Sequence, residues 1–494
     1  MGSIDDGAVA MRGQVSDETM AYHLSLLSHA NPMDDTAEGS LAPIFTGSML
    51  PRDQKSDGNP QVHQFGLLAG LSDKLSGPVT SVADDPRLFF NVTAPSSTFI
   101  CGSQGSGKSH TLSCILENCL ISSQAGRLPS PLGGVVFHYD TFISDSFGSP
   151  CEAAFLSSHP DVEVRVLCSP TNVHTIQACY SRFNISVTPL QIDQRYLNTK
   201  RMMDLMAVGQ DDGPMPLYMH TVQRVLREMR IVQQRTQTGF DYQEFKRRMR
   251  SSNLTPAQLE PLSQRLATLE SFMSQPQGGL SGGKEKSIPR GTDWKSKPRR
   301  LTVVDLSCPC ISPETACSLF NICLGIFLEQ DPCVGKVVAL DEAHKYMNRS
   351  IEARGFTETL LSAVRLQRHL GVRMIISTQE PTISTALLNL CSVTIVHRFS
   401  SPEWLRALHK HIAGAAGAPF SVQTESDSAV APAQSLFNQI VDLRVGEALI
   451  FAPSAIVGEI QDDGQLSLRR LGHGSLRVQI RNRLTTDGGR SVLA

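Results

Sequence analysis

The chain has 494 residues, which is enough for two to four domains or for one large domain with insertions. It is 40% hydrophobic and 19% charged, with a formal net charge of −2, so no chain-wide basic field argues for a nucleic-acid partner. Its twelve cysteines are scattered, which indicates reduced thiols in a cytoplasmic or nuclear protein rather than a disulfide framework. The longest apolar run, residues 316–328, is too short to span a bilayer, so we expect no membrane segment.

In chain order, the sequence predicts five regions. Residues 1–85 are rich in Ser, Asp, Gly and Pro and are expected to be largely disordered or irregular, with one helix near 16–28. Apolar strands then alternate with helices in two halves of a core, 86–244 and 300–460, separated by a basic insertion, 245–299, and followed by a C-terminal extension, 461–494. This alternation predicts an α/β fold with a central, mainly parallel sheet flanked by helices.

Net positive charge is concentrated in and just before the insertion. From Arg224 to Arg300 there are 16 Lys and Arg against 7 Asp and Glu, so the rest of the chain has a net charge of −11. The stretch from about Phe245 to Arg300 is expected to be a basic helical or low-complexity insertion, whose Gly-, Pro- and Lys-rich part forms a largely disordered loop or an insertion tip. Its clusters "KRRMR" (Lys246–Arg250) and "WKSKPRR" (Trp294–Arg300) could bind a phosphate backbone and stack a base, or could be a solvated loop or a nuclear-import signal.

A phosphate-binding loop is the strongest motif. "GSQGSGKS" fits G-x-x-x-x-G-K-[ST], follows the expected strand "STFIC" and precedes an expected helix. Glycines let backbone N–H groups surround phosphate oxygens, and the helix N-terminus adds its positive end. We expect Lys108 to reach the β- and γ-phosphates of ATP and Ser109 to ligate Mg²⁺. The full nucleotide-binding set comprises Gly102, Ser103, Gln104, Gly105, Ser106, Gly107, Lys108, Ser109 and His110.

A second motif lies in "VVALDEAHKYM", where an apolar strand ends in two carboxylates. Asp341 stands where a Walker B acid would support Mg²⁺, and Glu342 is the natural base to polarise an attacking water. The four letters DEAH also name a class of RNA helicases. The further motifs of that class are absent here, and Lys108 and Asp341 lie 233 residues apart.

A different family fits better. "LSGGK" (Leu280–Lys284) imitates the ABC ATPase signature but lies in a Gly- and Lys-rich tract, and we interpret it as coincidence. "GVRMIISTQEPT", "AVRLQRHLGV" and "VTIVHRFSSPEWL" instead resemble, in the right order, motifs of the HerA/FtsK superfamily of P-loop ATPases. The resemblance covers about 95–460 without the insertion, and it implies a RecA-like fold.

The resemblance also implies roles for two more residues. Gln379 would sense the γ-phosphate or hold the water, and Arg398 would be an arginine finger that acts on a neighbouring subunit of a homo-oligomeric, hexameric ring. The expected activity is ATP hydrolysis that drives DNA translocation. The alternative is a nucleotide-gated switch or scaffold that assembles protein partners. Glu380 departs from the family, which has an arginine after the glutamine.

Overall fold

The computed structural model describes residues 40–50, 62–77, 84–144, 148–206, 217–273, 291–411, 431–462 and 465–488. The helix expected near 16–28 and the "LSGGK" stretch lie outside these residues. No described helix has both the length and the apolar character that crossing a bilayer requires.

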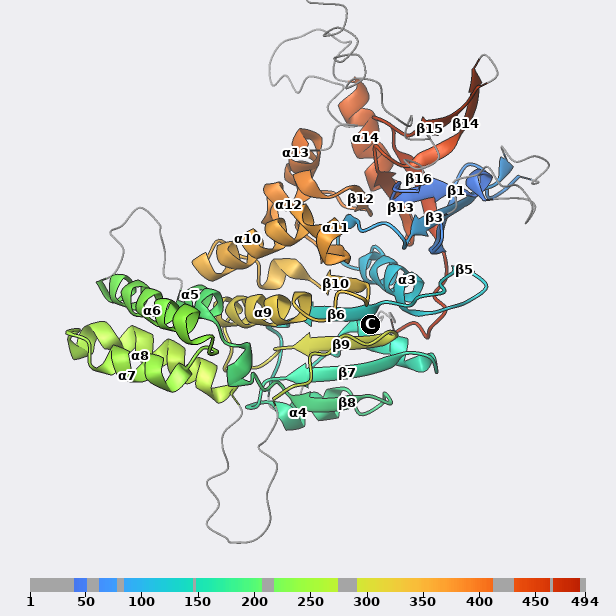
Figure 1. Ribbon diagram of the computed structural model, residues 1–494. Coiled ribbons are helices and arrows are strands. Elements are labelled where there is room, and N and C mark those ends of the chain that lie inside the picture. The colour runs from blue at the N-terminus through green and yellow to red at the C-terminus, as the bar shows by residue number, and fades with distance from the viewer. Residues whose placement is uncertain are drawn as a thin grey trace, which may run out of the picture.

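One mixed sheet forms the centre of the molecule (Figure 1). Eight of its strands are mutually parallel and adjacent in the order β12, β4, β11, β10, β6, β9, β7, β8. Their bounds are β4 Ser97–Cys101, β6 Gly133–His138, β7 Glu163–Cys168, β8 Ser186–Pro189, β9 Arg300–Asp305, β10 Lys336–Leu340, β11 Val372–Thr378 and β12 Val393–Val396.

The β12 edge continues into strands from both ends of the chain. This mostly antiparallel part has the order β13, β16, β2, β3, β1, β14, β15, in which only β1 and β14 run parallel, and β5 pairs with β2. Its strands are β1 Ile44–Thr46, β2 Phe65–Leu71, β3 Arg87–Asn91, β5 Gly126–Arg127, β13 Glu447–Phe451, β14 Ile456–Asp462, β15 Gln465–Arg470 and β16 Leu476–Ile480.

Helices cover both faces of the parallel strands, so these strands are apolar on both sides. On β6, for example, Val135 and Phe137 face one hydrophobic core and Val136 faces the other. The second core contains α3 (Lys108–Leu120), the 3₁₀ segment η3 (Glu152–Ser158) and α4 (Val173–Cys179). The first contains α5 Thr199–Met206, α6 Leu217–Thr236, α7 Tyr242–Arg250, α8 Pro256–Ser271, α9 Pro313–Leu328, α10 Ile351–Arg365, α12 Thr385–Leu390, α13 Pro402–His411 and α14 Ala431–Val441.

The expected fold class is confirmed, and most expected core elements lie where the sequence places them. In the strand order β12-β4-β11-β10-β6, one strand, β11, lies between the P-loop strand β4 and the Walker B strand β10. That insertion is the arrangement of RecA-like P-loop folds. The twelve cysteines are all free thiols, as expected.

The N-terminal boundary is corrected. Strands β1 and β2 fall inside the region 1–85 that we expected to be largely irregular, and both pair in the main sheet. Each has its partners far along the chain, since β1 also pairs with β14 and β2 with β16. Short apolar stretches among Gly and Pro become strands here because distant segments supply their hydrogen-bond partners.

The described part of the basic insertion is largely helical. Helices α7 and α8 form there, and they lie with α6 at one end of the molecule, to the left in Figure 1. Phe245 and Leu269 are fully buried between them, so the amphipathic spacing outweighs the high charge. Trp294 is only 1% exposed, so the alternative in which its ring stacks on a base is excluded. Of the basic side chains, Lys246 pairs with Glu270.

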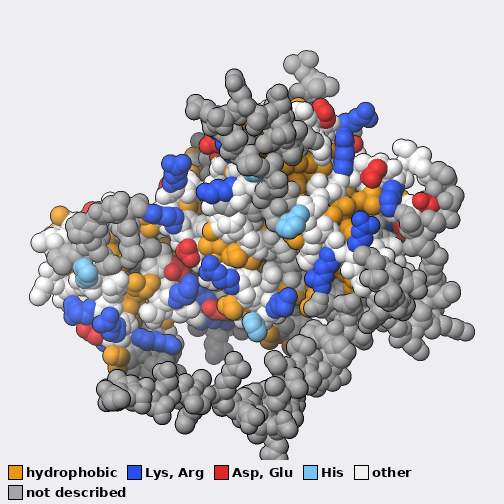
Figure 2. Space-filling view, turned by 90° about the horizontal axis from the view of Figure 1, so that it is seen from above, with side chains coloured by type: hydrophobic (Ala, Val, Ile, Leu, Met, Phe, Trp, Pro, Cys, Tyr) orange, Lys and Arg blue, Asp and Glu red, His pale blue; other side chains and the backbone are white. Residues whose placement is uncertain are grey.

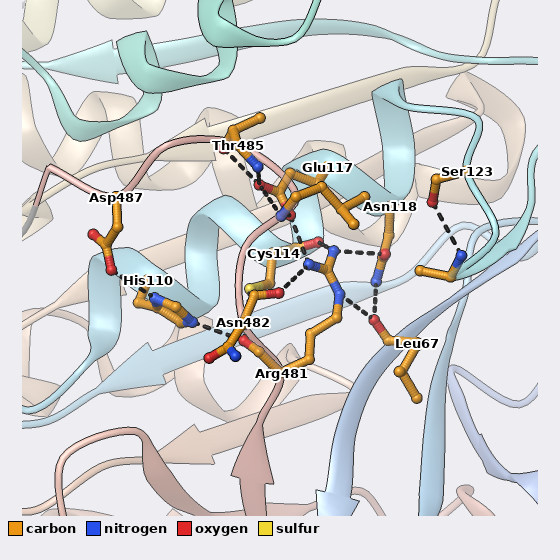
Figure 3. Close-up of polar contacts among 12 residues, drawn as sticks. Leu67, His110, Cys114, Glu117, Asn118, Ser123, Arg481, Asn482, Thr485 and Asp487 are labelled. Carbon is orange, nitrogen blue, oxygen red and sulfur yellow. Dashed lines mark hydrogen bonds and ion pairs between the residues drawn. The ribbon is translucent and has the colours of Figure 1, made fainter.

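The segment 481–487, here the C-terminal strap, packs on α3 (Figure 3). Glu117 of α3 is completely buried and accepts from Arg481 Nη1 at 2.7 Å, from the backbone N–H groups of Leu484 and Thr485, and from the Thr485 hydroxyl at 2.6 Å. Arg481 Nε also donates to the Leu67 carbonyl of β2 at 2.7 Å. The strap therefore ties the P-loop helix to the N-terminal strands.

Replacing Arg481 by Ala should destabilise the fold strongly, because the buried Glu117 carboxylate loses its cation. Removal of one partner of a buried ion pair costs about 3–5 kcal/mol. The matched control is Arg477→Ala, which breaks an exposed pair with Glu447 at 2.9 Å and should cost less than about 1 kcal/mol. Chemical denaturation measures both, and equal losses would contradict a structural role for the buried pair.

Candidate nucleotide site

The P-loop connects β4 to α3 and has the backbone of an anion cradle. Gly105 has φ 72° and Gly107 has φ 112°, left-handed values that side chains rarely adopt, so glycine is required at both turns. Ser103 anchors the loop to the end of β12, because its N–H and its hydroxyl both donate to the Arg398 carbonyl at 2.9 Å. The Ser106 hydroxyl closes the turn on the Ser103 carbonyl at 2.7 Å.

Lys108 lies buried inside the loop. Its Nζ donates to the Ser103 carbonyl at 3.0 Å, so the loop itself binds one of the three ammonium N–H groups. Burial lowers the pKa of Lys108, while the carboxylates of Glu342 and Asp341 act in the opposite direction. The structure therefore brings the expected phosphate-binding cation within the electrostatic reach of both expected Walker B carboxylates.

The two carboxylates occupy the turn after β10. Glu342 has φ 46° and ψ 47°, a left-handed conformation that costs a non-glycine residue on the order of 1–2 kcal/mol. This turn breaks the alternation of the strand, which would otherwise send successive side chains to opposite faces of the sheet. Both groups can therefore face the same region beside the P-loop, and burial followed by the Asp341 charge raises the pKa of Glu342.

The two carboxylate oxygens of Asp341 lie in different environments. Its Oδ2 accepts from His138 Nδ1 at 3.0 Å and from the Cys151 thiol at 3.5 Å. Its Oδ1 is buried and has no partner among the described residues. Burial alone would raise the pKa of Asp341, but the hydrogen bond from His138 lowers it, so the group stays ionised.

This geometry fits a divalent cation beside the P-loop. The unpartnered Oδ1 of Asp341 is a hard acceptor, and the half-buried Ser109 follows Lys108 in the first turn of α3. Oxygen donors of this kind suit Mg²⁺, which usually keeps several waters and binds through one or two carboxylates and substrate phosphates. Ser109 and Asp341 are thus the residues that would hold it.

Gln379, Glu342 and His344 form one polar cluster. Gln379 follows β11, and its Nε2 donates to Glu342 Oε2 at 3.2 Å. The Gln379 N–H donates to His344 Nδ1 at 3.4 Å, and the same ring nitrogen lies 3.3 Å from Glu342 Oε2. Burial lowers the pKa of His344 to about 4, so the ring is neutral at pH 7 and can accept that bond.

Other expected residues lie apart from this cluster. The Arg398 side chain is exposed, while its carbonyl holds the P-loop. His110 turns to the C-terminal strap, where its Nε2 lies 2.8 Å from the Arg481 carbonyl and its Nδ1 lies 3.5 Å from Asp487 (Figure 3). Gln104 is exposed at the tip of the loop, and Glu380 is exposed beyond β11.

Three histidines have contacts that sequence reasoning did not predict. His138 holds Asp341, His344 contacts both Glu342 and Gln379, and His397 connects the P-loop helix to the sheet. The Nε2 of His397 lies 2.9 Å from the Thr111 hydroxyl of α3, and its Nδ1 lies 2.9 Å from the Glu447 carbonyl. A strand-end position was the one available signal, since His138 and His397 both sit at the carboxyl ends of parallel strands.

Because burial lowers the pKa of His397 to about 4, protonation of this ring opposes folding. The unfolded ring has a pKa near 6.5, so its contribution is complete above about pH 6.5 and falls as the pH drops towards 4. The fall in pKa from about 6.5 to about 4 corresponds to a loss of about 3 kcal/mol of stability at low pH.

Replacing His397 by Asn, which keeps a donor for the Glu447 carbonyl, should flatten the stability–pH curve in this window. Thermal melts between pH 4 and 7 measure the effect. The control His473→Asn changes an exposed ring and should keep the wild-type slope. An unchanged slope in the His397 variant would show that other groups control the acid sensitivity.

No family model and no curated protein matches the sequence. Among solved structures, VirB4 of Thermoanaerobacter pseudethanolicus is 10% identical over 85% of this chain and 97% of its own, with a TM-score of 0.47. The plasmid coupling protein TrwB is 11% identical over 89% of this chain and 99% of its own, with a TM-score of 0.46. The genome packaging NTPase B204 of Sulfolobus turreted icosahedral virus 2 is 9% identical over 76% of this chain and 97% of its own, with a TM-score of 0.27.

At these identities and scores no residue role is carried over from those proteins. The fold rests instead on this chain's own features, which are the glycine-dependent loop between β4 and α3, the single strand β11 inserted beside β10, and the carboxylate pair after β10. By these features the chain has the RecA-like P-loop NTPase fold that the HerA/FtsK-like resemblance of its sequence implies.

Proposed function

We propose that the chain binds ATP with Mg²⁺ at the P-loop and hydrolyses it, and that hydrolysis drives work on DNA in a homo-oligomeric ring. The observation that supports hydrolysis is the contact between Gln379 Nε2 and Glu342 Oε2 at 3.2 Å, at the ends of two adjacent strands. A chain that only binds nucleotide needs a phosphate cradle, but it does not need a half-buried base oriented by an amide.

Each residue then has a defined task. The loop N–H groups and Lys108 bind the phosphates, and Lys108 exchanges its bond to the Ser103 carbonyl for a phosphate oxygen. Glu342, whose pKa is raised by burial, accepts a proton from the attacking water. Gln379 can donate to the γ-phosphate or to Glu342, so it couples the state of the nucleotide to the base. Mg²⁺, when bound by Ser109 and Asp341, neutralises phosphate charge.

Arg398 is proposed to act on a neighbouring subunit. Its side chain is exposed and forms no ion pair among the described residues, whereas its backbone is fixed to the P-loop through Ser103. A guanidinium held this way is available to a second molecule, where its charge would stabilise the transition state. The exposed Glu380 lies near the same edge, so charge pairing between subunits there differs from the family pattern.

For nucleic acid, the outward face of α6 is a better candidate surface than the tract around Trp294. Arg227, Arg230 and Arg235 are exposed and lack ion-pair partners among the described residues. In Figure 2 Lys and Arg side chains are spread over the visible face, and some of them lie at the left end, which holds α6 in Figure 1. Unpaired arginines on one helix can neutralise backbone phosphates without reading sequence.

Glu342→Gln tests hydrolysis. The amide keeps the shape of the side chain but cannot accept the proton, so the ATPase rate should fall about 10²–10⁴-fold while ATP binding persists. The matched control Glu358→Gln changes an exposed carboxylate on α10 and should leave the rate close to that of wild type. If wild type and Glu342→Gln bind ATP and share the same negligible rate, the proposal of hydrolysis fails.

The effect of DNA on the ATPase rate distinguishes a DNA motor from a nucleotide-gated switch. Single- or double-stranded DNA should stimulate the ATPase of a motor, whereas no stimulation at low or moderate salt would favour a nucleotide-gated scaffold. The variant R227A/R230A/R235A should weaken DNA binding and reduce the salt slope by up to about 3. The comparison variant K295A/K297A tests the tract next to Trp294, and a loss of binding only there would show that the α6 surface is wrong.

A further inference from the structure

The Asp341 oxygen that is not assigned to Mg²⁺, Oδ2, lies in a group of three possible metal-binding atoms. His138 Nδ1, the Cys151 thiol and a carboxylate oxygen of Asp341 all lie within 4.8 Å of one another, and all three residues are buried. The distances are 3.0 Å from Nδ1 to Oδ2 and 3.5 Å from Sγ to Oδ2. Ligands about 2.0–2.3 Å from a tetrahedral ion are separated by similar distances.

The three donors are held by rigid elements. His138 ends β6, and Asp341 follows the adjacent strand β10, so sheet pairing fixes their separation. Cys151 precedes η3, and its N–H donates to the Tyr180 hydroxyl at 2.8 Å. That hydroxyl donates to Asp305 Oδ2 at 2.7 Å. Outer hydrogen bonds of this kind orient the ligands of metal sites.

Two buried atoms in the group lack partners, which is costly for polar groups removed from water. His138 Nε2 and Asp341 Oδ1 have none among the described residues. Hydrogen bonding within the group therefore satisfies only Nδ1 of His138 and Oδ2 of Asp341. These two atoms would bind a cation in the centre of the group, while Oδ1 of Asp341 would not contact that cation.

We propose that His138, Cys151 and Asp341 form a second cation site, for a divalent ion of the zinc class, that shares the Walker B carboxylate with the Mg²⁺ site. Imidazole, thiolate and one carboxylate are donors that Zn²⁺ and Co²⁺ accept and that Mg²⁺ does not favour. Binding deprotonates the thiol and frees Nδ1, so protons leave as the ion enters. Asp341 Oδ2 binds this ion, and Oδ1 remains for Mg²⁺.

Co²⁺ is the probe, because a cobalt–thiolate bond gives a near-ultraviolet charge-transfer band and tetrahedral coordination gives intense visible bands. The full-length protein is stripped with EDTA, desalted and incubated with Co²⁺ without nucleotide. We expect one equivalent to produce both features, Zn²⁺ to abolish them, and excess Mg²⁺ to leave them unchanged. This readout is independent of ATP hydrolysis, so the site can fail while the proposed function stands.

Variants assign the site. Cys151→Ser and His138→Asn should lose the thiolate band or weaken Co²⁺ binding by more than about 100-fold, beyond the range typical of outer hydrogen-bond partners. Cys168→Ser removes a different buried thiol, and Cys310→Ser an exposed one; both should keep the spectrum. No cobalt–thiolate band in wild type, or a band that survives Cys151→Ser, would overturn the proposal and leave the three residues as a hydrogen-bonded support for Asp341.

Discussion

The single strand β11 inserted between β4 and β10 is the constraint on which the candidate site depends. Parallel strands end at the same edge of a sheet, so this order places the P-loop, Gln379 and the Asp341–Glu342 pair next to one another. The left-handed turn at Glu342 then directs two successive carboxylates towards one region, at a cost in backbone energy. Strain of this kind persists where the surrounding fold fixes the backbone, here directly after the fully buried strand β10.

Sequence reasoning succeeded where the signal is local. A glycine-rich loop between a strand and a helix, or an apolar run that ends in acids, contains its own structural instructions, so Lys108, Asp341 and Glu342 could be placed in advance. It failed where partners are distant. Strands β1 and β2 are short and lie among Gly and Pro, and only pairing with β14 and β16, near the other end of the chain, makes them part of the sheet.

The insertion shows a second limit. Composition left helix and low-complexity loop both open, and the buried stripe that includes Phe245 and Leu269 decides the structure of α7 and α8, where Lys246 pairs with Glu270. The histidines show a third limit. His138, His344 and His397 gain their importance from neighbours up to 286 residues away, and nothing adjacent in the sequence identifies those neighbours.

The hydrogen bond from Arg481 Nε to the Leu67 carbonyl joins residues 414 positions apart, and the same guanidinium neutralises Glu117 in the middle of the P-loop helix. Contacts of such high sequence separation form slowly, because the entropy of closing a long loop is lost before the contact contributes. Until that closure, α3 carries an acidic side chain on the face that must be buried. Burial of that carboxylate, and with it the packing of the P-loop helix, therefore depends on a cation supplied from the far end of the described chain.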